Sequence, residues 1–419
     1  MLRNCKVFVS LWNKQTPMKH HKILLNLIVV IFILIQENEL FGQNTNPKFV
    51  SKAGIGIVMP DSLFSINFRF RIQSRAGVTF KEGEDTPEEV DFRIRRIRLR
   101  LDGFMLDPRL TYQIQLSFSR ADMDWDNSNV PNVLRDAMIH YAATPNWTIS
   151  MGQGKLPGNR QRVISSSELQ FADRSIVNNA LTLDRDVGLF TNFKIPIKKT
   201  VLLLKAALTS GEGRNALPSK DGVAYTGRVE FLPLGAFTDR GDYFEGDLLR
   251  EPKPKISIAF GANLNEGAIR TGGTLGQFLY QPRSFTGINS DFLFKYIGWA
   301  YCLEYMNRIM VNNQTPFTTF VDGSKTLTRY VYAGEGLHQQ LSYCTTKAWE
   351  FAVRYSTLTP ANSIHPNEKN ITQIGFGFSK YLRKHRVKIQ SDIFYDQQTS
   401  IVNEQTNRFG CRFQMELGI

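Results

Sequence analysis

After residue 43 the sequence has no apolar run of the roughly 20 residues that a membrane-spanning helix needs. Cysteine is scarce, and Cys302, Cys344 and Cys411 are too widely spaced for a disulfide framework or a metal site. Histidines are few and scattered, and no Gly-x-Ser-x-Gly pattern occurs. We therefore expect no enzyme active site, no metal and no cofactor. A transmembrane β-barrel is still allowed, because its strands show only half of their residues to lipid.

The N-terminal 43 residues have the composition of a secretory signal. A basic cluster at residues 19–22 precedes an almost unbroken apolar run at 23–35, and a polar stretch then leads to Gly42 and Gln43. We predict that residues 1–43 are a signal peptide cleaved near this point, with an uncleaved anchor helix as the alternative. The formal net charge of +13 would suit nucleic acid, but export separates the chain from it, so we expect no nucleic-acid partner.

From residue 64 onward, apolar and polar residues alternate. In residues 64–73, three Phe and two Ile share one face, and the other face carries Arg69 and Arg71. In a membrane barrel the apolar face contacts lipid and the arginine face lines the lumen. The next strand, 90–101, changes phase in its middle, so we predict a β-bulge at Arg95-Arg96, after which Arg98 and Arg100 face the lumen.

The connections between the predicted strands are short turns and long polar loops in alternation, which is typical of an outer-membrane barrel. The predicted fold is all-β: a transmembrane antiparallel barrel of about 16 strands, one of them at 329–344. Residues 44–63 would be a periplasmic lead and residues 64–419 the barrel. A barrel of this size leaves room for an aqueous channel.

Aromatic residues lie where strands meet the predicted short turns, namely Tyr141, Trp147, Tyr296, Trp299 and Tyr381. Such positions are typical of the membrane interface, with ordinary hairpin packing as the alternative. The connection 234–254 breaks the rhythm, because it should be short. Its acidic residues indicate a solvated turn, a periplasmic contact or a cation site.

The segment 155–184 is too long for an ordinary hairpin loop and carries nine Val, Ile, Leu or Phe residues. An exposed loop would not hold so many apolar residues without packing them. We predict that this loop folds into the lumen and narrows it. Capping of the outside, or contact with a neighbouring subunit, is the alternative.

Short motifs in and around this segment occur in a recognisable order. They are Arg135-Asp136-Ala137, Gly152-Gln153-Gly154-Lys155-Leu156-Pro157-Gly158, Ser165-Ser166, Phe171, Asp173-Arg174-Ser175, Arg185-Asp186-Val187-Gly188, Trp349-Glu350 and Arg354-Tyr355-Ser356. As an ordered set they resemble the phosphate-selective porin O and P family, from about Phe64 to the last residue. The resemblance implies a usually trimeric outer-membrane porin, surrounded by membrane lipids and lipopolysaccharide, with a constricting third external loop.

The founding members of that family favour phosphate or polyphosphate through a ladder of arginines and constriction lysines. This sequence departs from the pattern at Gly158, where an aromatic residue is usual, and at Arg160-Gln161-Arg162, which replaces a usual acidic residue. Rings of Arg or Lys pass anions, so we expect small anionic solutes such as phosphate. The candidate pore and anion-binding residues are Arg69, Arg71, Arg98, Arg100, Lys155, Arg160, Arg162 and Arg174.

Three carboxylates in the same segment, Glu168, Asp173 and Asp184, can pair with these arginines. For any single arginine, the alternative to anion binding is therefore a structural role. The function predicted from the sequence is passive diffusion of small hydrophilic solutes. The alternative is a structural or docking barrel of a larger outer-membrane assembly, without an open pore.

Overall fold

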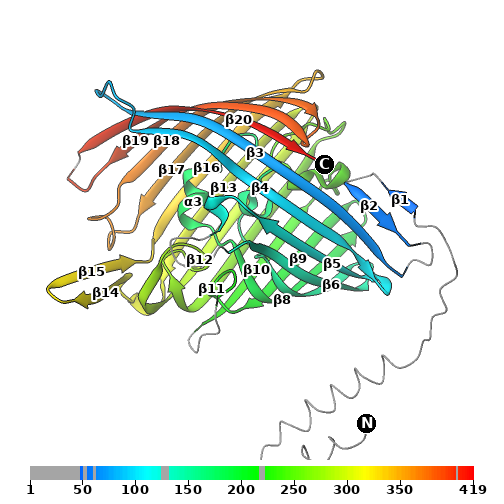
Figure 1. The fold of residues 1–419 in the computed structure, drawn as a ribbon, viewed down its shortest axis with the longest axis horizontal. Coiled ribbons are helices and arrows are strands. Elements are labelled where there is room, and N and C mark those ends of the chain that lie inside the picture. Colours follow the sequence, from blue (N-terminus) through cyan, green and yellow to red (C-terminus); the bar gives the residue numbers. More distant parts are fainter. Residues whose placement is uncertain (1–47, 51–53, 60–62, 124–131, 217–221, 403) are drawn as a thin grey trace, which may run out of the picture. The chain divides into compact units, whose positions relative to one another are not determined.

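The computed structural model describes residues 48–50, 54–59, 63–123, 132–216, 222–402 and 404–419, so the predicted signal peptide lies outside the described residues. Sixteen strands form the barrel (Figure 1). They are β3 (Ser65–Lys81), β4 (Glu89–Met105), β5 (Asp107–Ser117), β6 (Leu134–Thr144), β7 (Trp147–Lys155), β8 (Arg185–Ile197), β9 (Thr200–Thr209), β10 (Val223–Leu232), β11 (Lys255–Arg270), β12 (Phe278–Tyr296), β13 (Trp299–Met310), β16 (Gly334–Cys344), β17 (Trp349–Pro360), β18 (Asn370–Arg383), β19 (Val387–Thr399) and β20 (Gln405–Gly418).

Each strand pairs antiparallel with its sequence neighbours in the barrel, and β20 pairs with β3 to close it. The closing register runs from Arg408 opposite Lys81 to Gly418 opposite Arg71. Closure leaves no free sheet edge in the spanning region, which lipid requires. The predicted 16-stranded barrel is therefore confirmed.

A small hairpin of β1 (Lys48–Val50) and β2 (Ile55–Val58) continues the sheet beyond the end of β20. Ile55 of β2 lies opposite Phe68 on the same edge of β3 that β20 covers farther along. Part of the predicted N-terminal lead thus forms strands that extend the wall.

Alternation along the strands decides which side chains face the lumen. In β3, Gln73 is buried while Ile72 is exposed on the outer face. Gln73 pairs with Arg96 and Ser74 with Ile94, so Arg95 is the extra residue, and the predicted bulge is confirmed.

The long loops leave the barrel at one end and the short turns at the other, and by the convention of outer-membrane barrels these ends are external and periplasmic. A separate hairpin, β14 (Phe317–Asp322) and β15 (Lys325–Tyr330), stands in the loop before β16. The predicted strand 329–344 was wrong only at its start: the barrel strand β16 begins at Gly334, and residues 325–330 pair with β14 instead of the barrel. Among the described residues, no helix is both long and apolar enough to span a membrane.

Most of the predicted interface aromatics face outward. Tyr141, Trp147 and Trp299 are exposed on the outer wall, near short turns. Tyr381 is the exception: it is buried inside the barrel, and its hydroxyl donates to Glu350. Its expected place at the interface was wrong, because its position in β18 belongs to the inward-facing phase.

The connection between β7 and β8 lies inside the barrel and contains two short helices, α2 (Arg160–Val163) and α3 (Ile176–Leu181). Its apolar side chains are buried against the inner wall, where glycines leave room for them. Phe171 packs against Gly375 and Gly377 of β18, and Val177 packs against Gly336 of β16. The remaining short helical turns are η1 (Arg120–Asp122), η2 (Thr238–Tyr243) and η3 (Val311–Asn313).

The glycine hollow under Phe171 gives a test of this docking. A Cβ added at Gly377 would lie 3.0 Å from the Phe171 ring, and overpacking of this kind costs about 1–3 kcal/mol. We expect Gly377→Val to open the loop and to speed limited proteolysis within residues 155–184 by about tenfold. Gly227→Val is the control, since a Cβ there meets nothing within 4 Å. Equal cleavage rates in both variants would contradict the docking.

Candidate functional site

The inner loop, residues 155–184, is fixed to the inner wall of the barrel by buried polar contacts. Arg160 is fully buried, and its Nε donates to Asp291 of β12 at 2.8 Å, while its other nitrogens donate to Ser257 and to the carbonyl of Asp242. On the β19 wall, Lys388 and Gln390 donate to the carbonyl of Leu169. These contacts hold the loop against the wall between β11 and β19, and Ser166 of the loop also accepts from Arg71 of β3 and Arg98 of β4.

The unusual connection 234–254 also enters the barrel, from the end that carries the short turns. Glu245 accepts hydrogen bonds from Gln161 Nε2 and from the Gln170 backbone N–H, and its own N–H donates to the Glu168 carbonyl. Lys295 of β12 donates to three carbonyls of this connection. Two segments from opposite ends of the barrel thus meet inside it.

Asp239 of this connection is exposed, but four of its acidic residues are not solvated, so the predicted solvated turn was wrong for those four. Asp242, Glu245, Asp247 and Glu251 are all buried, and Asp247 accepts from the backbone N–H of Gly298. Glu245, Asp247 and Glu251 accept hydrogen bonds from backbone, amide and hydroxyl groups. In the described part of the chain, no group of three or more His, Cys, Asp or Glu residues is arranged to hold a metal ion.

Two cavities remain beside the inner loop, along the strands β4–β9. The outer cavity has a volume of 280 Å³ and lies among the long loops; the inner one has a volume of 870 Å³ and reaches residues 239–244 of the connection. Arg98, Lys155 and Arg185 line both cavities. These three residues therefore lie between the two cavities.

The outer cavity is strongly basic. Ten cations line it against three carboxylates, Asp122, Asp173 and Asp184. The cations are Arg93, Arg95, Arg96, Arg98, Arg135, Lys155, Arg162, Arg174, Arg185 and Arg214.

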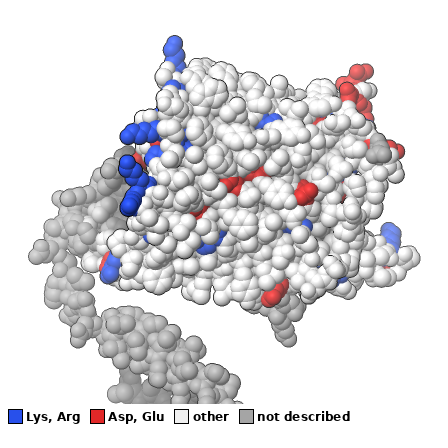
Figure 2. Space-filling model, turned by 180° about the vertical axis from the view of Figure 1, so that it is seen from behind, with Lys and Arg blue, Asp and Glu red and all other residues white. Residues whose placement is uncertain are grey.

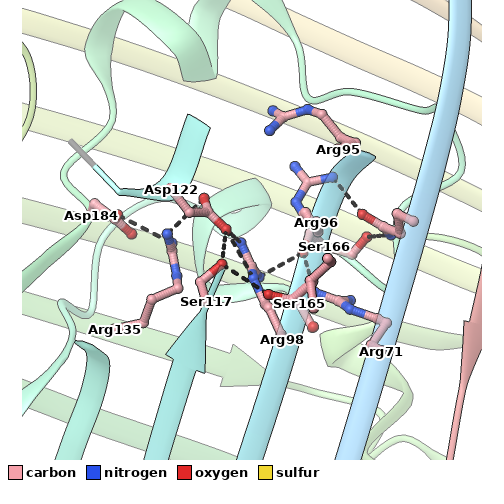
Figure 3. Close-up of polar contacts among 12 residues, drawn as sticks. Arg71, Arg95, Arg96, Arg98, Ser117, Asp122, Arg135, Ser165, Ser166 and Asp184 are labelled. Atoms are coloured by element: carbon pink, nitrogen blue, oxygen red, sulfur yellow. Dashed lines mark hydrogen bonds and ion pairs between the residues drawn. The ribbon is translucent and has the colours of Figure 1, made fainter. Parts of the chain in front are cut away.

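Each of the three carboxylates is shared by at least two arginines, as Figure 3 shows for Asp122. Burial alone would raise the pKa of these carboxyls, but the neighbouring guanidiniums outweigh it and hold the pKa of all three below the usual aspartate value. The pairs are Asp122 with Arg98 and Arg135, Asp173 with Arg75, Arg95 and Arg412, and Asp184 with Arg135, Arg162 and Arg185.

Three lining cations, Arg96, Lys155 and Arg174, form no ion pair with any residue that the structure describes. Arg96 donates to the side-chain oxygen of Gln73 at 2.7 Å. Lys155 Nζ and the Arg174 guanidinium donate to backbone carbonyls of the inner loop at 2.7–3.1 Å. These neutral oxygens satisfy the hydrogen-bond donors of the three cations but do not neutralise their charge. The cavity therefore keeps a positive potential.

The predicted pore residues fall into three groups. Arg98, Arg100, Lys155, Arg162 and Arg174 line at least one cavity. Arg71 and Arg69 face inward, Arg71 donating to Ser166 Oγ of the inner loop and Arg69 pairing with Asp102. Arg160 lines neither cavity and anchors the loop instead.

The sequence prediction missed several lining residues. The bulge turns Arg95 toward Asp173 although it neighbours Arg96, so two successive arginines face the lumen. The phase change in the sequence already indicated this bulge, and it was the signal that could have identified Arg95 as a lining residue. Arg135 and Arg185 stood in recognised motifs, but their approach to Asp184 depends on the folded loop.

Residues 66–238 match the family described as phosphate-selective porin O and P. The match confirms the predicted resemblance over this range. The protein is an outer-membrane porin of a Gram-negative cell, a channel and not an enzyme. The matched range spans the strands β4–β9, the inner loop and the three residues shared by the two cavities of the porin, Arg98, Lys155 and Arg185.

The porin has no match among curated protein sequences. Among solved structures, the outer-membrane channel DcaP of Acinetobacter baumannii is 13% identical with a TM-score of 0.51, over 88% of this chain and 99% of that one. OmpT of Vibrio cholerae, in its trimer form, is 12% identical with a TM-score of 0.48, over 84% and 99%. The likeness to DcaP shows the barrel fold alone.

Asp173 gives a pH-dependent test of the arginine cluster. Because the arginines lower its pKa, its stabilising contribution is full above the unfolded value of about 3.9 and is lost as the pH falls below it. We expect the thermal stability of the wild-type porin to fall more steeply between about pH 5 and pH 2 than that of Asp173→Asn. Asp322→Asn, at an exposed hairpin, is the control and should keep the wild-type slope. Parallel slopes for the wild type and Asp173→Asn would refute the assignment.

Proposed function

We propose that this porin lets small hydrophilic solutes diffuse passively through the two cavities, and that it favours anions such as phosphate. The observation that carries the proposal is the surplus of positive charge in the outer cavity. Its three carboxylates are already shared among arginines, and Arg96, Lys155 and Arg174 have no carboxylate partner among the described residues. A mobile anion is the group that would neutralise them.

The basic lining continues into the inner cavity, which supports a path for anions rather than a single binding site. Seven cations line this cavity against four carboxylates, Asp136, Glu168, Asp239 and Asp242. Beyond the three shared residues, the cations are Arg100, Lys194, Lys205 and Arg240. Guanidinium groups stay charged and offer paired donors that fit phosphate oxygens. In our proposal the inner loop makes the constriction, and the connection 234–254 supports it from the other end.

We also propose that the porin is a homotrimer, that lipopolysaccharide contacts its external rim, and that residues 1–43 are its signal peptide. The resemblance to the family supports the first two proposals and the N-terminal pattern supports the third. Native mass spectrometry of the purified porin tests the trimer, and the N-terminal sequence of the exported protein tests the cleavage. A monomer, or a retained N-terminus, would overturn the respective proposal.

The selectivity is tested by the reversal potential in a planar bilayer under a potassium chloride gradient, repeated with potassium phosphate. We expect an anion-selective potential in both salts. The triple variant Arg96→Gln, Lys155→Gln, Arg174→Gln should lower the anion-to-cation permeability ratio by at least about threefold, because it removes the surplus charge.

A matched control removes the same charge from the exposed periplasmic end, with Lys198→Gln, Lys199→Gln and Lys253→Gln. Water and salt screen those positions, so the control should keep the wild-type ratio. Cation selectivity of the wild type, or equal loss in both triple variants, would contradict the proposal. The absence of any conductance would favour the docking barrel.

A further inference from the structure

The two ends of the barrel differ in charge. The six short turns, residues 106, 145–146, 198–199, 297–298, 345–348 and 384–386, hold five Lys or Arg and no Asp or Glu. The long loop 82–88 at the other end holds four Asp or Glu and no basic residue. Figure 2 shows blue side chains protruding along the left edge of the barrel and red ones at its upper right. The periplasmic rim is therefore basic.

At the periplasmic ends of β17 and β18, basic residues combine with outward-facing apolar residues in a cluster that we call the rim patch: Lys347, Trp349, Lys380, Leu382 and Arg383. Lys380 lies opposite Trp349 in the register of β17 and β18, with its Nζ 4.7 Å from the centre of the Trp349 ring. The same Nζ donates to the Lys347 carbonyl at 2.7 Å, which holds it at the rim.

No carboxylate neutralises the rim patch. Lys347, Lys380 and Arg383 form no ion pair with any residue in the described ranges. The adjacent Glu350 points into the barrel, where it accepts from Gln170, Ser342 and Tyr381. Trp349 and Leu382 are 37% and 60% exposed, an arrangement suited to the depth where lipid headgroups meet acyl chains.

An apolar groove of 610 Å³ lies on the outer face of the same strands. Its floor is one row of paired residues across five strands: Val353 of β17, Phe376 of β18, Ile393 of β19, Cys411 of β20 and Val78 of β3. Phe376 precedes Lys380 by four residues, which is about 13 Å along a strand. An acyl chain in one leaflet, about 15 Å thick, spans that distance.

We propose that this surface is a binding site for an anionic phospholipid of the periplasmic leaflet. The phosphodiester headgroup binds Lys380 and Arg383 beside Trp349, and an acyl chain lies along Phe378 into the groove. The headgroup end of the site lies away from the long loops, so the lipopolysaccharide of the external leaflet is not the ligand of these cations. The groove itself extends toward the other end, to Phe80 of β3 and Phe409 of β20. The cations match the phosphate, and the row of apolar residues matches the chain.

The test is native mass spectrometry of the folded full-length porin in detergent, titrated with phosphatidylglycerol or phosphatidylcholine. We expect the wild type to retain phosphatidylglycerol with higher affinity than phosphatidylcholine. Lys380→Gln with Arg383→Gln should lower the affinity for phosphatidylglycerol by at least about tenfold and leave phosphatidylcholine nearly unchanged. Phe376→Ala should weaken the binding of both lipids, because it removes part of the apolar surface that lines the groove.

The control is Lys198→Gln with Lys199→Gln, which removes the same charge from another short turn without this groove. Heat-modifiable gel migration confirms that each variant has folded. Equal loss of phosphatidylglycerol in the control would show that only the general charge of the rim matters, and equal affinity of the wild type for both lipids would show that no headgroup is recognised. Either result would overturn the proposal.

Discussion

The constraint on which this structure depends is the absence of water from hydrocarbon, which obliges every backbone N–H and C=O in the spanning region to find a partner in the protein. The barrel meets it by pairing β3 with β4 on one edge and with β20 on the other. Where β20 ends, the Ile419 N–H still donates to the Phe70 carbonyl, and β2 takes over at Phe68. Lipid then covers the apolar outer face, and the polar residues of every strand are left to the inside.

A polar interior can hold segments that have no regular structure of their own. The inner loop and the connection 234–254 carry many backbone carbonyls that no helix or strand satisfies. The wall supplies donors for them: Lys388 and Gln390 bind the Leu169 carbonyl, and Lys295 binds three carbonyls of the connection. Glycines at inward positions, such as Gly377, receive the few apolar side chains. The same alternation that faces lipid outside thus builds a polar docking surface inside.

The sequence predicted what depends on local pattern. The period of two identified the strands and showed that Arg69, Arg71, Arg98 and Arg100 face inward. A phase change in the alternation located the bulge. The prediction from the sequence failed where tertiary contacts determine the structure. Residues 325–330 have good strand composition, but only the pairing partner β14 distinguishes a loop hairpin from a barrel strand.

The candidate site shows the same division. Nothing in the local sequence around Arg160 indicates that Asp291, some 130 positions later, will bury it, whereas Arg162, two residues away, lines the outer cavity. The buried acidic connection was also beyond reach, since its partners Gln161 and Gln170 belong to a loop from the opposite end. Charge composition predicted a basic pore, and only the folded chain shows which cations remain unneutralised.

The bulge in β4 has a consequence for how this strand can change in evolution. Before it, Phe92 and Ile94 face outward; after it, Ile97 and Leu99 do, in the opposite phase. Loss of the single residue Arg95 would force one half of the strand to turn over. Either the phenylalanine would enter the polar lumen, or Arg98 and Arg100 would meet lipid, at about 2–4 kcal/mol each near the bilayer midplane. In this strand a deletion is therefore a more drastic change than almost any substitution.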